Sequence, residues 1–515
     1  MSSNALNQVY KTGILAIEQS LLTQDENAGA TTLHVSGKYM TDTPFVVGKT
    51  YVVRDDTDTF GMAGSPNMER IRVTSVNIVA TPMVDGIGYS CAGTIGVEGY
   101  NEDGWLGGIL NNYTTGNNAA VLTPGIEMAI QSADFNCRFK TLADAPKIDP
   151  DDESERFATG DEGRDPAIMG ARSGEITFTQ KLAWAGAVST VPKWRKIMES
   201  LGHVMRRYTS TGIGFLPHTW ANEITATIWI LAPENGAFPT STVYRYRGAH
   251  GGNGSSIAVG KVGDVYMLTA KYNAAYVGTM DISIAHARSL TSPETTIPEV
   301  MLSNSITVPS VYGRAVVPSG YAIIAALVTG KSLQEGSRFY SVDGSDTTDN
   351  ALAMAKGSAL VKGDSFTVDA GGTAVTYVTS EKAIDISQFS LDFGAMVTSY
   401  IDQSTSTGNA YFATTDRDPR FTCNPYHVPK GDDDMDFVVT NGVCGKVKIQ
   451  SALTSPHLTI DIPNAQLLQP AIASREGYVN TNRTYRPLRN NQGAGKKESE
   501  LPDQVMYEIL IGDRS

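Results

Sequence analysis

The chain has 515 residues, of which 41% are hydrophobic and 18% are charged, and its formal net charge is −13. This composition excludes a disordered chain, because it provides enough apolar side chains for a core. The acidic balance argues against a protein that coats nucleic acid, since phosphate contacts need Lys or Arg. The 50 Gly and 23 Pro favour short strands and turns over long helices.

The cysteines are spaced neither as a disulfide framework nor as a zinc site. They are Cys91, Cys137, Cys423 and Cys444, and we interpret them as buried free thiols. The first residues, MSSNALNQVYKTGILAIEQ, lack a charged segment followed by an apolar core, so no signal peptide is predicted. The longest apolar run, YAIIAALV, is too short to span a membrane. We therefore expect a soluble protein made without export in a reducing cytoplasm.

The first third of the chain predicts one helix followed by short strands. A helix is predicted around LAIEQSLL, residues 15–22. Strand-like pieces between residues 30 and 104 are separated by Gly, Pro and Asp turns. Alternating strands follow in ADFNCRFKTL, residues 133–142, and in GEITFTQKL, residues 174–182. The acidic stretch between them, 143–173, is too long for a simple connection and is predicted to have a role of its own.

One helix is well signalled in STVPKWRKIMESLGH. Thr190 is predicted to cap it, Pro192 to lie in its first turn and Gly202 to end it. The apolar residues Trp194, Ile197, Met198 and Leu201 then fall on one stripe of the helix.

The second half of the chain repeats the strand pattern. Residues 313–383 end in KGDSFTVDAGGTAVTYV, which predicts a hairpin around Gly371 and Gly372. In ISQFSLDFGAMV, residues 386–397, Phe389, Leu391 and Phe393 alternate with polar or small residues. KVKIQSAL and LTIDIP predict two further strands near residues 446–463.

These elements predict a β framework that carries two inserted β modules. The framework comprises residues 1–29, 105–312 and 384–515, and the modules comprise 30–104 and 313–383. A weak internal echo links residues 127–182 with residues 385–422, since each reads as strand, polar loop and strand. Duplication of one fold and a single undivided fold both remain open at this point.

No stretch of the sequence supports catalysis or cofactor binding. GNGSSIAVGKVGD is not a phosphate-binding loop, because Val262 stands where Ser or Thr is needed, and we interpret it as a β-turn. KGDDDMDF lacks the rest of a calcium loop, so a solvated acidic turn is favoured over a weak ion site. The seven histidines show no metal-ligand spacing, and no GxSxG motif is present. We predict no enzyme, no cofactor and no metal.

Four segments in this order resemble the tail tube (major tail) proteins of long-tailed bacteriophages. They are SGEITFTQKLAWAGAVSTVPKWRKIMESLGH, YRYRGAHGGNGSSIAVGKVGDVYMLTAKYNAAYVG, ISQFSLDFGAMV with TTDRDP, and LTIDIPNAQLLQPAIASREGYV. The resemblance covers about 300 residues outside the two modules, and the order of these loose motifs is more specific than any one of them.

The resemblance implies a mainly β fold, a tail-tube β-sandwich or barrel with one flanking α-helix and the two inserted modules. It implies a virion protein, assembled in the host cytoplasm, that forms rings stacked into a hollow tube through which DNA passes during ejection. The expected partners are further copies of the chain in six-fold or pseudo-six-fold rings, together with tape measure, tail terminator and baseplate or tail-tip proteins. DNA would be in transit only, and no membrane is involved.

The polar sides of two predicted strands are the expected lumen residues, because the apolar sides fill the core. These candidates are Glu175, Thr177, Thr179, Lys181, Ser390 and Asp392, with Gly394 continuing the second set. The long loops at 143–173 and 399–412 are expected to contact the next ring or a neighbouring subunit. Their candidate residues are Asp151, Asp152, Glu153, Glu155, Arg156, Arg164 and Asp402.

Several alternatives stay open on the sequence alone. The negative charge either lines the lumen, where it would keep DNA from binding, or merely aids solubility. Each ring has either six chains or three chains that carry a duplicated fold. A different class of function, a receptor- or carbohydrate-binding β-rich virion protein, is the alternative to the tube.

Overall fold

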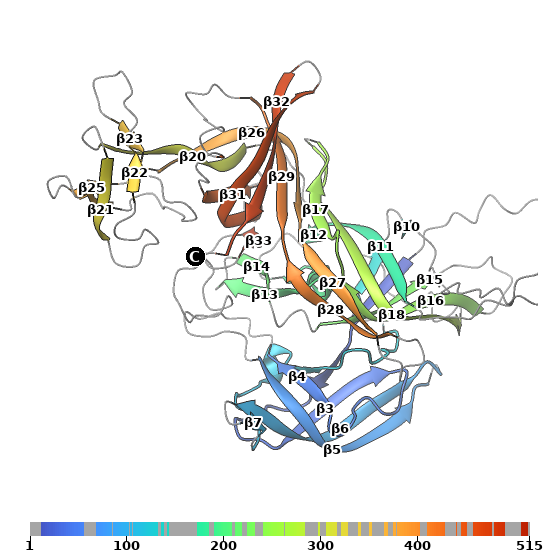
Figure 1. Cartoon of the computed structure of the whole chain (residues 1–515). Helices are drawn as coiled ribbons and strands as arrows, with labels where there is room; N and C mark the ends of the chain where they lie inside the picture. Colours follow the sequence, from blue (N-terminus) through green and yellow to red (C-terminus); the bar gives the residue numbers. More distant parts are fainter. Residues whose placement is uncertain are drawn as a thin grey trace, which may run out of the picture.

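The computed structural model describes most residues between Thr12 and Gly512. It does not describe residues 1–11, 56–67, 85, 102–103, 106, 132–134, 139–141, 144–172, 185–189, 209–211, 219–223, 232–239, 262, 284–296, 299–304, 317–320, 328–337, 341–349, 353–364, 369–373, 377–378, 402–408, 428–438, 440–443, 451–456, 476–477, 490–505 and 513–515. In the described part the chain is mainly β, as predicted, with strands β1 to β33 and the short helix α1 (Figure 1).

Seven strands close a first barrel. They are β1 (Thr12–Ile17), β9 (Phe135–Arg138), β10 (Leu142–Ala143), β11 (Gly174–Lys181), β15 (Ala226–Leu231), β16 (Thr240–Gly251) and β18 (Met267–Ser283). β1 pairs with β15 and β9, and β10, which follows β9, pairs with β11. β11 pairs with β18, β18 with β16, and β16 with β15. Every pairing is antiparallel, and β9 and β10, which follow each other in the sequence, together complete the ring between β1 and β11.

Six strands close a second barrel in the C-terminal half. They are β20 (Ser305–Val316), β26 (Thr379–Asp392), β29 (Arg420–Pro425), β30 (Cys444–Gln450), β31 (Leu458–Arg475) and β32 (Tyr478–Pro487). β20 pairs with β26 and β30, and β26 pairs with β29. β29 pairs with β32, β32 with β31, and β31 with β30.

The two barrels share one pairing order. The ring order of the first barrel is β1, β9 with β10, β11, β18, β16 and β15. The corresponding order in the second barrel is β20, β26, β29, β32, β31 and β30, and each corresponding pair is antiparallel. The echo segments of the sequence, residues 127–182 and 385–422, hold β9 to β11 and β26 to β29, which are equivalent strands. The fold is therefore repeated within the chain.

A short strand joins the two barrels into one sheet. β17 (Ser256–Val259) pairs with β18 of the first barrel and, along its other edge, with β26 of the second barrel. The strands β11, β18, β17, β26, β29 and β32 therefore lie side by side in that order. The β-turn predicted for this stretch therefore leaves out the strand that it contains.

Alternation of apolar and polar residues places the core inside the barrels. In β11 the buried residues Ile176 and Phe178 alternate with exposed or half-buried polar residues. In β26 Phe389 and Leu391 are buried, and the backbone continues into buried Phe393. These side chains belong to one apolar cluster that also includes residues of β30 and β31, such as Ile449 and Ile460. Burial of this cluster is the main stabilising contribution of the fold.

The predicted helix is present but shorter than the sequence indicated. α1 spans Arg195–Ser200, its N-cap is Trp194, and no side chain caps it, so the capping role predicted for Thr190 is wrong. Gly202 follows the helix with a φ of +83°, a conformation that favours glycine and ends the helix as predicted. Trp194, Ile197, Met198 and Leu201 are all buried in the core.

The helix predicted at residues 15–22 is wrong, because this segment forms two strands. It contains most of β1 and the whole of β2 (Gln19–Leu22). Residues Ile14 to Ile17 are all buried: Leu15 and Ile17 face the barrel core, while Ile14 and Ala16 join a second apolar cluster. A strand that is buried on both faces shows no alternation, and its apolar run was mistaken for a helix.

A third, smaller barrel holds residues 19–122. Its strands are β2, β3 (Thr32–Tyr39), β4 (Thr50–Arg54), β5 (Met68–Pro82), β6 (Tyr89–Asn101) and β8 (Ala120–Leu122), with β7 (Gly104–Trp105) attached to β6 and the 3-10 turn η1 (Thr115–Asn117) before β8. The order β2, β3, β6, β5, β4, β8 returns to β2. This small barrel, blue in Figure 1, has a core of its own that includes Leu33, Val53 and Ile95.

The remaining strands extend these three bodies. β13 (His203–Tyr208), β14 (Gly212–Pro217) and β33 (Glu508–Gly512) continue from β31. β21 (Tyr321–Leu327), β22 (Arg338–Tyr340), β24 (Ser365–Val368) and β25 (Ala374–Thr376) form a four-stranded sheet, and β23 (Asn350–Leu352) pairs with β20. β12 (Ala183–Trp184) pairs with β19 (Ile297–Pro298), and β27 (Ala395–Ile401) with β28 (Asn409–Arg417). The domain boundaries proposed from the sequence stay predictions.

Candidate functional site

The two predicted sets of lumen residues lie on one face of the six-stranded sheet that joins the barrels. Residues that pair directly across antiparallel strands point to the same side of a sheet. One row of paired residues consists of Thr179, Thr269, Ser256, Asp392 and Arg420. The next row consists of Lys181, Met267, Ala258, Ser390, Thr422 and Thr484. We call this surface, together with Glu175, Thr177 and Lys271, the polar face.

Residues of the polar face are accessible while their neighbours along each strand are buried. Glu175, Lys181 and Thr422 are exposed, and the other residues of the polar face with a described exposure are half-buried. Ser256, Lys271 and Arg420 were not predicted, because their places on this face depend on strand pairings that a local pattern does not show, such as that of Ser256 with Asp392. The only local signal for β17 was the short alternating run SIAV after a glycine turn.

Charges of both signs occur on the polar face. Lys271 Nζ lies 2.5 Å from Glu175 Oε1 on the neighbouring strand. Asp418 accepts hydrogen bonds from Arg420 Nη2 at 2.5 Å and from Arg486 Nε at 2.9 Å. The described part of this face therefore carries both signs of charge, and its Lys271 and Arg420 contact carboxylates.

Gly394 lies just beyond the end of β26, the second predicted lumen strand, and does not continue it. Its φ is +63°, and a Cβ atom there would lie 2.1 Å from the carbonyl carbon and oxygen of Asp418. Its N–H donates to Asp392 Oδ1 at 2.8 Å, and its carbonyl accepts from the N–H of Asp418 at 2.9 Å. Only glycine fits this turn, which directs the chain from β26 into the β27–β28 hairpin.

None of the predicted inter-ring residues falls in the described part of the chain. Asp151, Asp152, Glu153, Glu155, Arg156, Arg164 and Asp402 all lie outside it. The hairpin that leads to Asp402 is described: β27 and β28 pair only with each other in the described part. Its side chains include exposed Tyr400 and Ile401, and the rings of Tyr400 and Tyr411 stack with centroids 5.1 Å apart.

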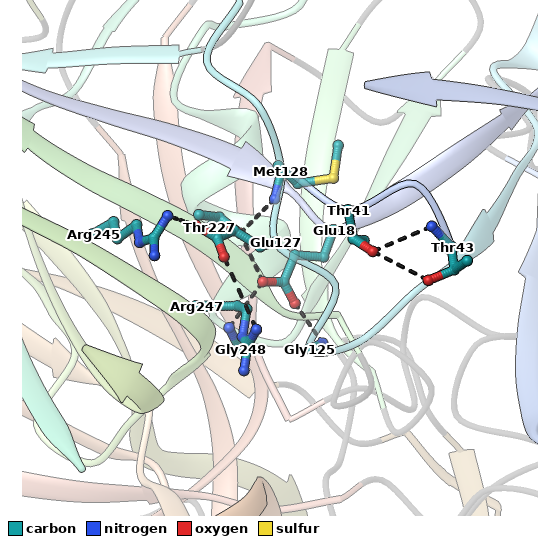
Figure 2. A network of polar contacts seen from close by, with 10 residues as sticks. All are labelled: Glu18, Thr41, Thr43, Gly125, Glu127, Met128, Thr227, Arg245, Arg247 and Gly248. Carbon is teal, nitrogen blue, oxygen red and sulfur yellow. Dashed lines mark hydrogen bonds and ion pairs between the residues drawn. The ribbon is translucent and has the colours of Figure 1, made fainter. Parts of the chain in front are cut away.

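A buried carboxylate joins the small barrel to the first barrel (Figure 2). Glu18 is the single residue between β1 and β2, and its side chain accepts four hydrogen bonds. The donors are Gly125 N at 2.6 Å, Thr225 Oγ1 at 2.6 Å, Thr227 Oγ1 at 2.7 Å and Gly248 N at 2.8 Å. Burial raises the pKa of Glu18, and the four donors oppose that rise.

Two ion pairs and an apolar cluster complete this joint. Arg54 Nη2 of the small barrel lies 3.4 Å from Glu199 Oε2 of α1. Glu199 Oε1 also accepts a hydrogen bond from Arg195 Nε at 2.6 Å. Burial alone would raise the pKa of Glu199, but the two guanidinium groups hold it below its usual value. Glu127 pairs with Arg245 of β16. Around these contacts pack residues of both bodies, including Tyr39, Cys91, Trp229 and Val243.

No protein-family model matches the chain, and no curated protein matches it either. Among the described residues no group of three or more His, Cys, Asp or Glu side chains could hold a metal ion. The helices of the described part include none that is long and apolar enough to cross a membrane. Cys91 and Cys423 are buried free thiols. The geometry of the sheet is thus the main guide to function.

Proposed function

We propose that the chain is a structural virion protein that assembles into stacked rings and so forms a hollow tail tube for the passage of DNA. The observation that carries the proposal is the continuous polar face over six strands of two linked barrels. The wall of a water-filled tube requires a wide sheet with one polar, solvent-accessible face and one apolar face that packs against a core.

Open sheet edges support self-association. Edge strands present unpaired backbone groups that attract further strands, and soluble proteins usually block them. The β27–β28 hairpin instead exposes Tyr400, Ile401 and Tyr411 beside such edges. Cyclic symmetry turns these edges into closed contacts. We propose that the hairpin contacts the next ring of the stack.

The charges of the polar face are compatible with DNA in transit. Lys271 and Arg420 of the polar face, together with Arg486 of β32, each lie beside a carboxylate, so the attraction of these three cations for phosphate is offset locally. Sequence-independent binding requires several cations that release counterions on contact with phosphates. The proposed wall would therefore hold DNA weakly. Tape measure, tail terminator and baseplate or tail-tip proteins are the further partners that this role implies.

Negative-stain electron microscopy of the purified chain at rising concentration, with mass measured in parallel, tests the proposal. Hollow rings or stacked rings are the expected result. A chain that stays monomeric at every salt and protein concentration would contradict it. That outcome would favour the alternative, a receptor- or carbohydrate-binding virion protein, for which the stacked Tyr400 and Tyr411 rings would be the first surface to examine.

A further inference from the structure

The contact between the two barrels of one chain provides a template for contacts between chains. β17 adds to the edge of β26 with the register Ser256 to Asp392, Ile257 to Leu391, Ala258 to Ser390 and Val259 to Phe389. Ile257 is 0% exposed, and Tyr266, at the start of the segment leading into β18, is also 0% exposed and lies 5.5 Å from the ring of Phe389. β26 therefore covers the apolar side chains Ile257 and Tyr266 at the contact between the two barrels.

The second barrel carries the equivalent of β17 at the tip of the β31–β32 hairpin. Tyr272 of β18 lies opposite Ile176, and Tyr485 of β32 lies opposite Phe421. When these two buried tyrosines are matched, Leu268 and Thr481 become equivalent. Their partners across the strand pair are Ile257 and Ile472. The segment Ala471-Ile472-Ala473 therefore takes the place of Ser256-Ile257-Ala258.

The equivalent residues differ sharply in exposure. Ile472 is 76% exposed, whereas Ile257 is 0% exposed. The same alignment matches Val479 with Tyr266, and Val479 is 51% exposed. Along the outer edge of β31, pairing with β30 ends at Gln466, and no other strand of the described part continues it. Two apolar side chains and a strand edge thus lie open where the first barrel has them covered by β26.

The complementary edge belongs to the first barrel. β26 pairs with β20 through its first half and with β17 through residues Phe389–Asp392, while β29 lies on its other side. Its equivalent is β9 with β10: β9 pairs with β1, and β10 pairs with β11. The edge of β10 that corresponds to the β17-binding edge of β26 has no strand partner in the described part of the chain.

We infer that the tip of the β31–β32 hairpin of one chain adds as an antiparallel strand to the β10 edge of a second copy. The register of β17 on β26 fixes the expected pairs. Ser390 corresponds to Ala143, through their equivalent partners Thr422 and Thr177, and Ala258 corresponds to Ala473. Ala473 of one chain therefore pairs with Ala143 of the next. The inference specifies the ring contact of the proposed tube and rests on that proposal for closure of the ring.

Engineered cysteines test the pairing directly in the full chain. Ala143→Cys and Ala473→Cys are made in separate chains that carry different tags, mixed and oxidised, since directly paired strand positions suit a disulfide. A disulfide-linked dimer that contains both tags is expected, and it should be absent when either variant is oxidised alone. The double variant Ala258→Cys with Ser390→Cys is the positive control, because the same geometry exists within one chain.

A charge at the tip provides the second readout. Ile472→Asp should raise the concentration needed for assembly by about 100-fold or more, because the carboxylate would be buried in the contact. Its thermal unfolding as a monomer should match that of the wild type. Val79→Asp, at a 68% exposed position of the small barrel, is the matched control and should assemble normally.

The outcomes separate this inference from the proposed function. Rings that form without the mixed disulfide, and that tolerate Ile472→Asp, would overturn the strand addition and leave the tube intact. The mixed disulfide in particles that are not hollow would support the strand addition and contradict the tube. A tip-to-tip disulfide from Ala473→Cys alone would overturn the inference in favour of a two-fold contact.

Discussion

His203 is a buried histidine that is fully hydrogen-bonded in its neutral form. Nδ1 lies 3.2 Å from the carbonyl oxygen of Met198 and Nε2 lies 2.8 Å from the hydroxyl of Tyr507. The ring therefore donates through Nδ1 and accepts through Nε2. Burial and then the positive charge of Arg417 lower the pKa of His203 well below 6.5. The ring also contacts Phe393, so it links β13, the end of β26 and the C-terminal strand.

This lowered pKa predicts a stability that depends on pH. Below about pH 6.5 His203 binds a proton in the unfolded chain but not in the folded chain. The contribution of His203 to the free energy of unfolding is therefore fully present above that pH, and it is lost as the pH falls toward the pKa of His203 in the folded chain. His203→Gln keeps a donor and an acceptor but does not titrate. The free energy of unfolding of the wild type minus that of the variant should therefore decrease as the pH falls below about 6.5. The decrease should be at most about 1.4 kcal/mol per pH unit.

Urea unfolding at pH 8, 7, 6 and 5 measures this difference. The comparison with the variant cancels the contribution of other titrating groups. A difference that stays constant over the whole range would show that His203 titrates alike in the folded and unfolded chains, contrary to the prediction.

The joint between the small barrel and the first barrel is expected to depend on Glu18. Glu18→Ala removes the acceptor of two backbone N–H groups and two hydroxyl groups in a buried site. Leaving buried donors unsatisfied costs about 1–3 kcal/mol each, so a loss of about 2–5 kcal/mol is expected after partial relaxation. Chemical denaturation measures it. Glu98→Gln, which breaks a half-exposed ion pair with Arg72 in the small barrel, should cost less than about 1 kcal/mol.

The β27–β28 hairpin is expected to act between rings rather than within them. Replacing Tyr400 and Ile401 by serine removes exposed apolar surface without touching the core, so single rings should form normally and stacks should become shorter. Length distributions of stained particles measure the effect, with Val79→Ser as the control. Loss of single rings in the double variant would place the hairpin in the ring contact and contradict this assignment.

The strands that the sequence predicted correctly have one wet face and one packed face. β11 and β26 alternate because Ile176 and Leu391 face the core while Thr177 and Ser390 do not, and this period of two is visible locally. β1 has no solvent-exposed face, since the small barrel covers one side of it, and its apolar run was wrongly predicted to be a helix. The polar face as a whole was out of reach of local patterns, because β17 meets β26 across more than a hundred residues.

At the scale of the whole molecule, the repeated barrel changes the number of chains that a ring is expected to contain. Each chain already contains one β17–β26 type contact, and the inferred contact through Ile472 repeats it. A heterologous contact that recurs in this way closes into a ring when its rotations add to a full turn. The resemblance to tail tube proteins implies six barrels in that turn. With two barrels per chain, we therefore expect three chains per ring.

Class averages of single rings should accordingly show three-fold symmetry with six barrel-sized lobes around the lumen. The small barrels break the six-fold appearance, because the described strands of residues 19–122 pack on the first barrel of each chain, where Trp229 and Val243 contact them. Three outer projections per ring are therefore expected on alternate lobes, and ring mass should be three times the chain mass. Six projections, or a mass of six chains, would mean that the repeated barrel does not substitute for a subunit.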